Sequence, residues 1–183
     1  PLIAQYRTKP LSDNIKTLQV VIAGENQYSL PIIDLNEMKQ LTISFDELSH
    51  DLHNYYYMIE HCNADWIPSS VSPLEFANGF TTDIAITDAQ MSMNTTVNYT
   101  HYTLTIPNED IQLKISGNYA LSIYEDSNRD NKLAVVCFSI VDEKVAIDAQ
   151  IRGNTDTDIR GKLQQLDFTV FTGNYKINNP LSE

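Results

Sequence analysis

The sequence predicts an all-β protein: an immunoglobulin-like antiparallel β-sandwich followed by strands of a truncated second β-domain. Three observations predict this fold class. Short segments of alternating apolar and polar residues recur along the chain, turn-forming residues separate them at roughly regular spacing, and no long segment has the period of a helix. Hydrophobic residues make up 42% of the 183 residues, which is enough for a packed core.

The predicted strands follow an N-terminal arm, residues 1–14, that shows no clear period. The segment 41–45 (LTISF) alternates most cleanly, with its apolar residues toward the core and its threonine and serine toward solvent. Pro31 has no N–H to donate, so it places the strand 28–35 at a sheet edge or a bulge. The strands predicted for the sandwich are 15–23, 28–35, 41–45, 55–62, 102–106, 111–115, 119–124 and 133–141, with shorter pieces at 84–86 and 95–97.

The stretch 54–80 (NYYYMIEHCNADWIPSSVSPLEFANGF) joins the strand 55–62 to a long polar loop marked by prolines. Loops of this length without regular structure are usually functional or disordered. Trp66, the only tryptophan, and Phe76 and Phe80 are predicted as partner-binding residues, because large aromatic side chains on a loop can anchor a protein or a sugar. The alternative is that they fold back and cap the end of the sandwich.

A tyrosine corner is predicted at 116–121 (SGNYAL), where a glycine lies two residues before Tyr119 and Leu121 lies two residues after it. In immunoglobulin-like domains this arrangement lets the tyrosine hydroxyl bond to nearby backbone. The motif therefore favours the immunoglobulin-like variety of sandwich. The alternative is an ordinary half-buried tyrosine.

The sandwich is predicted to occupy residues 15–142, and a boundary is predicted near residue 142. After it, 145–151 (VAIDAQI) and 163–171 (LQQLDFTVF) are further predicted strands. Two lone strands bury too little surface to be stable by themselves. We therefore expect 143–183 to be the start of a second β-domain, incomplete in this chain, whose edges pair with the first domain or with another copy.

The net charge of −12 excludes several classes of partner. It argues against binding to nucleic acid and against electrostatic docking on anionic lipid. No apolar run is long enough to cross a bilayer as a helix. Because the chain starts at Pro1 and shows no signal-peptide pattern, we expect a processed or trimmed chain whose export signal is not in view.

The segment 126–131 (DSNRDN) is the sharpest metal-binding signal in the chain. The oxygen-bearing side chains of Asp126, Asn128 and Asp130 alternate as in the opening of a calcium loop. Asn131 stands where such loops carry glycine, and Cys137 stands where they carry a bidentate glutamate. The segment predicts a calcium site with these three ligands, and the alternative is a plain acidic hairpin turn.

Two cysteines, Cys62 and Cys137, fall in predicted strands. A disulfide between facing sheets and a pair of buried thiols are both open interpretations. The count of two does not decide the redox compartment.

The histidines are interpreted as structural or solvated. His50 and His53 belong to a polar turn, and His61 and His101 lie in or beside strands with no nucleophile motif near them. The chain shows no phosphate-binding glycine loop or zinc motif. The residues therefore show no visible catalytic chemistry, and no cofactor is expected. Paired carboxylates of the kind that hydrolyse glycosides stay an open alternative.

Four segments resemble a known family: 55–66 (YYYMIEHCNADW), 99–111 (YTHYTLTIPNEDI), 116–126 (SGNYALSIYED) and 177–180 (INNP). They are similar to the N-terminal part of the type IX secretion system plug protein of Bacteroidetes, over nearly the whole chain. The resemblance implies a non-enzymatic protein of the periplasm, associated with the outer membrane. Its partner would be the outer-membrane translocon β-barrel protein, whose periplasmic side it would plug by steric occlusion.

Two other functions remain open at this stage. The aromatic residues of the long loop favour a periplasmic or surface module that binds carbohydrate or peptide. An enzyme has only the abundance of acidic residues in its favour. The oligomeric state and the surface that contacts the translocon are left undecided by the sequence.

Overall fold

The structure is a computed structural model in which residues 5–37, 39–49, 51–126, 128–153, 155 and 163–176 are described. The chain divides into two compact units, Pro1–Asp142 and Glu143–Glu183.

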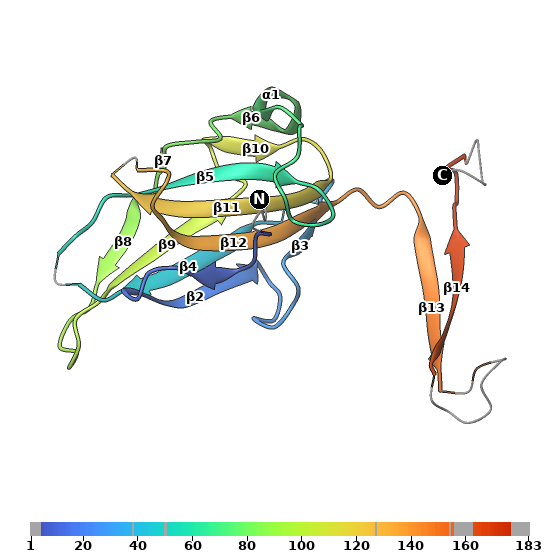
Figure 1. Ribbon diagram of the computed structural model, residues 1–183, viewed down its shortest axis with the longest axis horizontal. Helices are drawn as coiled ribbons and strands as arrows, with labels where there is room; N and C mark the ends of the chain where they lie inside the picture. Colours follow the sequence, from blue (N-terminus) through green and yellow to red (C-terminus); the bar gives the residue numbers. More distant parts are fainter. Residues whose placement is uncertain are drawn as a thin grey trace. The chain divides into compact units, whose positions relative to one another are not determined.

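The first unit is a β-sandwich, as predicted, built from two larger sheets and one two-stranded sheet (Figure 1). Sheet A has the strand order β1-β12-β11-β5-β7, with β3 parallel to one half of β12. Sheet B has the order β2-β4-β9-β8 and is antiparallel throughout. The strands of sheet A are β1 (Lys9–Pro10), β3 (Ile32–Asp34), β5 (Tyr55–Cys62), β7 (Ile84–Ala85), β11 (Gly117–Glu125) and β12 (Lys132–Val141). Those of sheet B are β2 (Ile15–Ile22), β4 (Leu41–Glu47), β8 (Asp88–Met91) and β9 (Thr100–Ile106).

The core forms where the inner faces of the sheets meet, and the alternation in the sequence determines which side chains enter it. Every second residue of β4 and of β9 is buried, as predicted for the segment 41–45. Three aromatic rings from β4, β5 and β9 pack together in the core near the start of β5. The ring centroids of Phe45 and Tyr102 are 5.2 Å apart, and those of Tyr55 and Tyr102 are 4.9 Å apart in an edge-to-face arrangement.

The central strand β11 is buried on both faces, and Figure 1 shows it between β5 and β12. Part of the N-terminal segment that was predicted as an irregular arm forms β1 and joins sheet A. The Tyr6 hydroxyl donates to Oε2 of Glu60 at 2.7 Å and accepts from Nζ of Lys132 at 2.6 Å. Thr8 Oγ1 accepts the backbone N–H of Cys137 at 2.9 Å. The arm therefore contacts the face of sheet A that points away from the core.

The predicted tyrosine corner is confirmed in its geometry. The buried Tyr119 donates its hydroxyl hydrogen to the carbonyl of Ile115 at 2.7 Å. Gly117 begins β11 with a φ of 150°, and a Cβ there would lie 2.3 Å from Nε2 of His61. The glycine therefore allows β11 to approach the side chain of His61.

Two predicted strands differ from the observed ones. The strand predicted at 28–35 is reduced to β3, and Pro31 lies just before it, as expected for a residue that cannot donate within a ladder. The extended piece predicted at 95–97 lies in the connection between β8 and β9, and the strand itself is Asp88–Met91. This strand, β8, lies at the edge of sheet B and has a mixed polar sequence. Its side chains do not alternate cleanly between buried and exposed.

Both cysteines lie in sheet A, so of the two open interpretations the pair of buried thiols holds in this structure and the disulfide between facing sheets does not. Cys62 is paired with Asn118 and Cys137 with Ala120, which places the whole of β11 between the two thiols. Adjacent strands are about 4.8 Å apart, so the Cα atoms are too far apart for a disulfide. Both cysteines are free and buried, and burial raises the pKa of each thiol to about 11.

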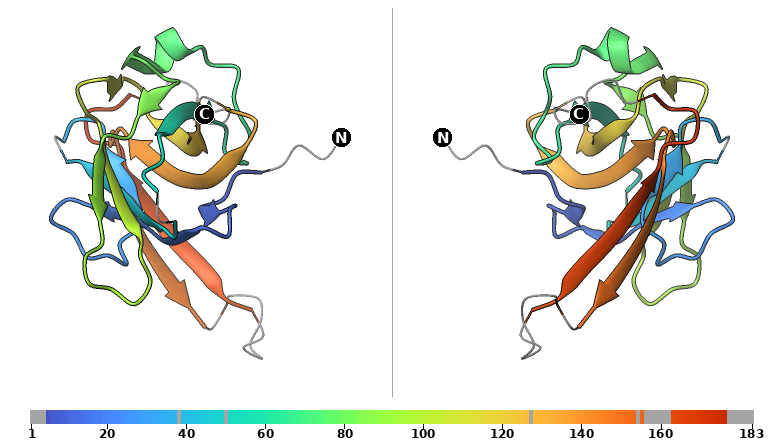
Figure 2. Two further views of the ribbon diagram at one scale, coloured as in Figure 1. Left: turned by 90° about the vertical axis from the view of Figure 1, so that its left-hand side faces the viewer. Right: turned by 90° about the vertical axis from the view of Figure 1, so that its right-hand side faces the viewer.

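The second unit contains a β-hairpin of β13 (Ala146–Arg152) and β14 (Gln165–Phe171), coloured orange to red in Figures 1 and 2. Directly opposed residues share a face, and one face is apolar throughout. That face consists of Ile147, Ala149, Ile151, Leu166, Phe168 and Val170. Phe168 in its centre is 64% exposed. Both predicted strands are present, and the assignment of 143–183 to a second β-domain stays a prediction.

Candidate functional site

The segment predicted as an irregular loop contains two short elements, α1 (Pro73–Phe76) and β6 (Ala77–Gly79). The backbone N–H of Ser72 donates to Oε2 of Glu75 at 2.8 Å, and Pro73 occupies the first turn. The strand β6 then pairs with β10 (Ile111–Leu113). The motif Ser-Pro-x-Glu was a readable signal for this turn of helix.

The structure separates the three aromatic residues predicted to bind a partner. Phe76 is 3% exposed and packs with its ring centroid 5.9 Å from that of Tyr119. The prediction that Phe76 presents a surface anchor is therefore wrong for this structure, and the alternative of folding back onto the sandwich holds for it. Trp66 is half-buried, and its carbonyl accepts the N–H of Tyr6 at 2.9 Å. Phe80 is 70% exposed.

Phe80 lies on the rim of a groove, called here the Phe80 groove, made of two adjoining hollows of about 280 and 560 Å³. The hollows share Ala85, Thr87 and Asp110. The chain forms this groove where it leaves β7, which pairs with β5 of sheet A, and enters β8, which pairs with β9 of sheet B. The groove therefore lies at the place where one connection passes between the two layers.

A backbone contact joins Phe80 to Asp110, which also lines the groove. The N–H of Phe80 donates to the carbonyl of Asp110 at 2.9 Å. Asn108 orders the same turn, because its Oδ1 accepts the N–H groups of Asp110 and Ile111 at 3.0 and 3.1 Å. Its Nδ2 donates to the hydroxyl of Tyr57 at 2.8 Å. The groove is thus built on hydrogen-bonded segments far apart in the sequence.

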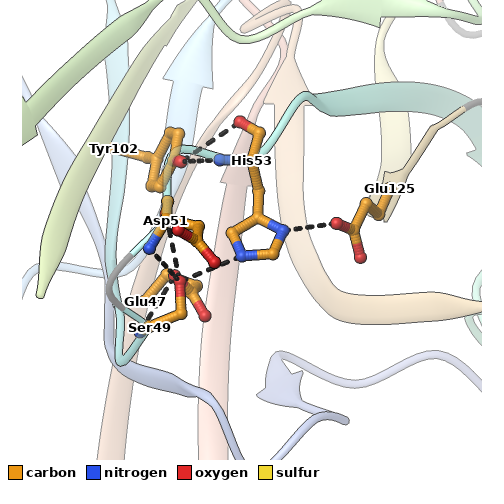
Figure 3. Close-up of polar contacts among 6 residues, drawn as sticks. All are labelled: Glu47, Ser49, Asp51, His53, Tyr102 and Glu125. Carbon is orange, nitrogen blue, oxygen red and sulfur yellow. Dashed lines mark hydrogen bonds and ion pairs between the residues drawn. The ribbon is translucent and has the colours of Figure 1, made fainter.

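A second polar site surrounds His53 at the end of the sandwich where β5 begins (Figure 3). The Nδ1 atom of His53 lies 2.5 Å from Oε1 of Glu125, and Nε2 lies 2.9 Å from Oγ of Ser49. The Ser49 hydroxyl donates to Oε2 of Glu47 at 2.6 Å. Because Glu47 ends β4 and Glu125 ends β11, this network joins sheet B to sheet A.

Ser49, His53 and Glu125 have the order of contacts found in a hydrolytic triad, but their hydrogens are arranged differently. A serine hydroxyl carries one hydrogen. Here the carboxylate of Glu47, which is 1% exposed as a residue, takes that hydrogen. The Oγ atom therefore accepts from Nε2 of His53, whereas a nucleophilic serine donates to its histidine. This arrangement, with Nδ1 donating to Glu125, favours the imidazolium form of His53, in which both ring nitrogens carry hydrogen.

The surroundings of His53 favour this charged form. Its pKa is raised, first by the hydrogen bond to Glu125, against the opposing effect of burial. The charges of Glu47 and Asp51 act in the same direction as Glu125. The imidazole stacks on Tyr55 with ring centroids 5.8 Å apart. This network was not predictable from local sequence, since Glu125 lies 72 residues from His53 along the chain.

The predicted calcium ligands lie in the turn between β11 and β12. Asp126 has a φ of 48°, and its N–H donates to the carbonyl of Asn54 at 3.3 Å. The N–H of Asn128 donates to the carbonyl of Glu125 at 3.0 Å, and Asp130 is exposed. In the part of the chain that the structure describes, no group of three or more His, Cys, Asp or Glu side chains is placed to hold a metal ion. The calcium site stays a prediction.

Comparison with known proteins gives a family match and similarity to solved structures. Residues 15–142 match the family model described as the type 9 secretion system plug protein 1st domain. The crystal structure of a hypothetical protein from Parabacteroides merdae ATCC 43184 is 41% identical, with a TM-score of 0.88, over 98% of this chain. The chain spans 45% of the length of that protein.

A second solved structure is a Niemann-Pick type C2 protein from Japanese carpenter ant, 11% identical with a TM-score of 0.39 over 74% of this chain and 98% of that one. Similarity at this level carries no argument about fold or function. No curated protein matches the chain.

Proposed function

The chain belongs to the type 9 secretion system plug protein family, and from this premise we propose that it plugs the periplasmic side of the outer-membrane translocon. The observation that carries the proposal is the family match over residues 15–142, the whole of the predicted sandwich. The proposed action is steric and needs no bond chemistry. The proposed partner is the translocon β-barrel protein, and the proposed location is the periplasm beside the outer membrane.

The fold supports a steric role. A plug has to keep its shape under contact, and the core of the first unit is closed by two sheets and by the His53 network at one end. Among the described residues, no helix is long and apolar enough to cross a membrane.

The charge distribution supports reversible docking. Residues 1–142 carry 7 Lys and Arg and 18 Asp and Glu, a net charge of −11 out of −12 for the chain. Complementary charge accelerates association and selects partners more than it adds affinity. The first unit therefore has the surface chemistry of a protein that is steered to a positively charged partner.

The test is a pull-down of the full-length protein from solubilised outer membranes, with identification of the captured barrel by mass spectrometry. Wild-type protein is expected to recover the translocon barrel. Trp66→Ala is expected to weaken recovery of the barrel if the loop after β5 lies at the contact. The matched control is Tyr28→Ala, which replaces an exposed tyrosine between β2 and β3. Failure to recover the barrel under conditions that preserve translocon complexes would contradict the proposal.

A further inference from the structure

We propose that the Phe80 groove binds an extended, positively charged peptide. This inference goes beyond the plugging role and does not depend on it. It rests on three properties of the groove: a size and a partly open strand edge suited to an extended chain, an excess of carboxylates on its walls, and an exposed aromatic ring on its rim.

The first property is the strand edge. β8 begins at Asp88, opposite Thr103, so β9 continues for three residues past the end of its neighbour. The N–H of Ser92 donates to the carbonyl of Tyr99. In an antiparallel ladder every second residue bonds to the same neighbour, so the backbone of Thr105 also faces the β8 side. Its carbonyl already accepts Nδ2 of Asn108 at 2.9 Å, so its N–H is the group directed to an added strand. Thr103 and Thr105 line the smaller hollow, and an extended peptide can add there in line with β8 by accepting this N–H.

The second property is the charge of the walls. Asp88, Glu109 and Asp110 line the groove, and neither lysine nor arginine is among its described lining residues. Asp83 also lines it, but Arg129 forms an ion pair with this carboxylate and offsets its charge. The three remaining carboxylates, all on exposed residues, give the groove a negative potential that added salt screens. Lysine and arginine side chains complement it.

The third property is the position of Phe80. Its ring is exposed on the rim of the larger hollow while its backbone is fixed to Asp110. A cationic side chain over the face of an aromatic ring gains electrostatic attraction in addition to apolar contact. The same ring would pack on the aliphatic part of a lysine. An aromatic rim beside acidic walls therefore favours a basic peptide over an acidic or a neutral one.

The experiment measures binding of two synthetic peptides to the full-length protein by isothermal titration calorimetry. One peptide alternates lysine with valine, and the other alternates glutamate with valine. The lysine peptide is expected to bind saturably and to weaken as salt is added, because screening reduces the attraction. Equal binding of both peptides, or no binding of the lysine peptide, overturns the proposal.

Variants test whether the groove is the place of binding. Phe80→Ala is expected to weaken binding about fivefold, within the range of a cation–π contact. The double variant Asp88→Asn, Asp110→Asn is expected to weaken it by a similar factor. The control Asp13→Asn, Asp65→Asn removes the same charge from exposed positions outside the groove lining and is expected to bind as wild type. A control that weakens binding as much as the groove variant would show non-specific attraction and overturn the proposal.

The same titration with neutral oligosaccharides separates the proposal from sugar binding. Saturable binding of a glycan that is lost in Phe80→Ala, together with no preference for the lysine peptide, would assign the groove to sugars and overturn the proposal. Thermal unfolding of each variant checks that it is folded. A variant that is unfolded at the assay temperature is replaced by Phe80→Leu, which keeps the apolar contact and removes the ring.

Discussion

Stability of the first unit should fall as pH rises through the titration of His53. In the folded protein the pKa of His53 is raised above its ordinary value of 6.5, mainly by the hydrogen bond to Glu125. A group with a raised folded pKa stabilises the fold fully below the unfolded pKa and loses that contribution as pH rises through the folded pKa. Unfolding free energy is therefore expected to be larger at pH about 6 than at pH about 8.

The size of the effect follows from the geometry. A hydrogen bond between charged groups, such as the 2.5 Å contact of His53 with Glu125, contributes about 1.5–3 kcal/mol where it is shielded from water. Here the side chains are 29% and 34% exposed, so solvent screens them. A loss of about 1 kcal/mol is the reasonable magnitude. In a domain of this size it lowers Tm by about 3 °C.

The assay is thermal unfolding followed by circular dichroism across this pH range, on wild type and on His53→Gln. The glutamine variant keeps a polar side chain but does not titrate. Its stability should therefore lose the part of the pH dependence that comes from His53. Glu125→Gln should have the same effect, because it removes the carboxylate that favours the imidazolium. An NMR titration of the His53 ring measures its pKa directly. The reasoning is refuted if His53→Gln retains the wild-type slope or if the ring titrates below 6.5.

Three further substitutions test the packing. Tyr119→Phe removes the hydroxyl that bonds to the carbonyl of Ile115 and should cost about 1–2 kcal/mol in urea unfolding, whereas an unchanged midpoint would show that the corner adds nothing. Gly79 has a φ of 97°, and the Cβ of an alanine there would lie 2.0 Å from the carbonyl oxygen of Asp110. Gly79→Ala should therefore cost more than about 2 kcal/mol in the same assay. Full stability would show that the two segments separate easily. Ser122→Ala should be neutral or stabilising by up to about 1 kcal/mol, since its buried hydroxyl has no partner among the described residues; a clear loss would reveal one.

The strands that sequence predicts well are those with one face in the core. In β4 and β9 apolar residues are buried and the polar residues between them are more exposed, so alternation alone identifies each strand and its buried face. The tyrosine corner was predictable for a related reason, because the bond from Tyr119 to Ile115 spans only four residues. The calcium ligands and the boundary of the second β-domain also come from local patterns, and both stay predictions.

Features formed by distant segments were not predictable in the same way. The walls of the Phe80 groove come from residues 80–88, 103–105 and 108–110 together with Tyr57. No local sequence pattern predicts that these segments lie together. The burial of Phe76 was not predictable for the same reason, since it depends on Tyr119, 43 residues further along the chain. Phe80, the next aromatic residue after Phe76, is exposed because β6, which lies between these two residues, turns the chain toward Asp110.

The two units have different surface chemistries, and this difference bears on how each can meet a partner. The first holds −11 of the net charge of −12, whereas the second carries 5 Lys and Arg against 6 Asp and Glu. The hairpin of the second unit exposes a continuous apolar face, which an isolated two-stranded hairpin does not maintain stably in water. Charge steers association over distance, and apolar burial holds surfaces in contact. Partners that meet the first unit should therefore be selected by charge, and whatever covers the hairpin should be selected by apolar shape, which supports the proposal that 143–183 begin a second β-domain.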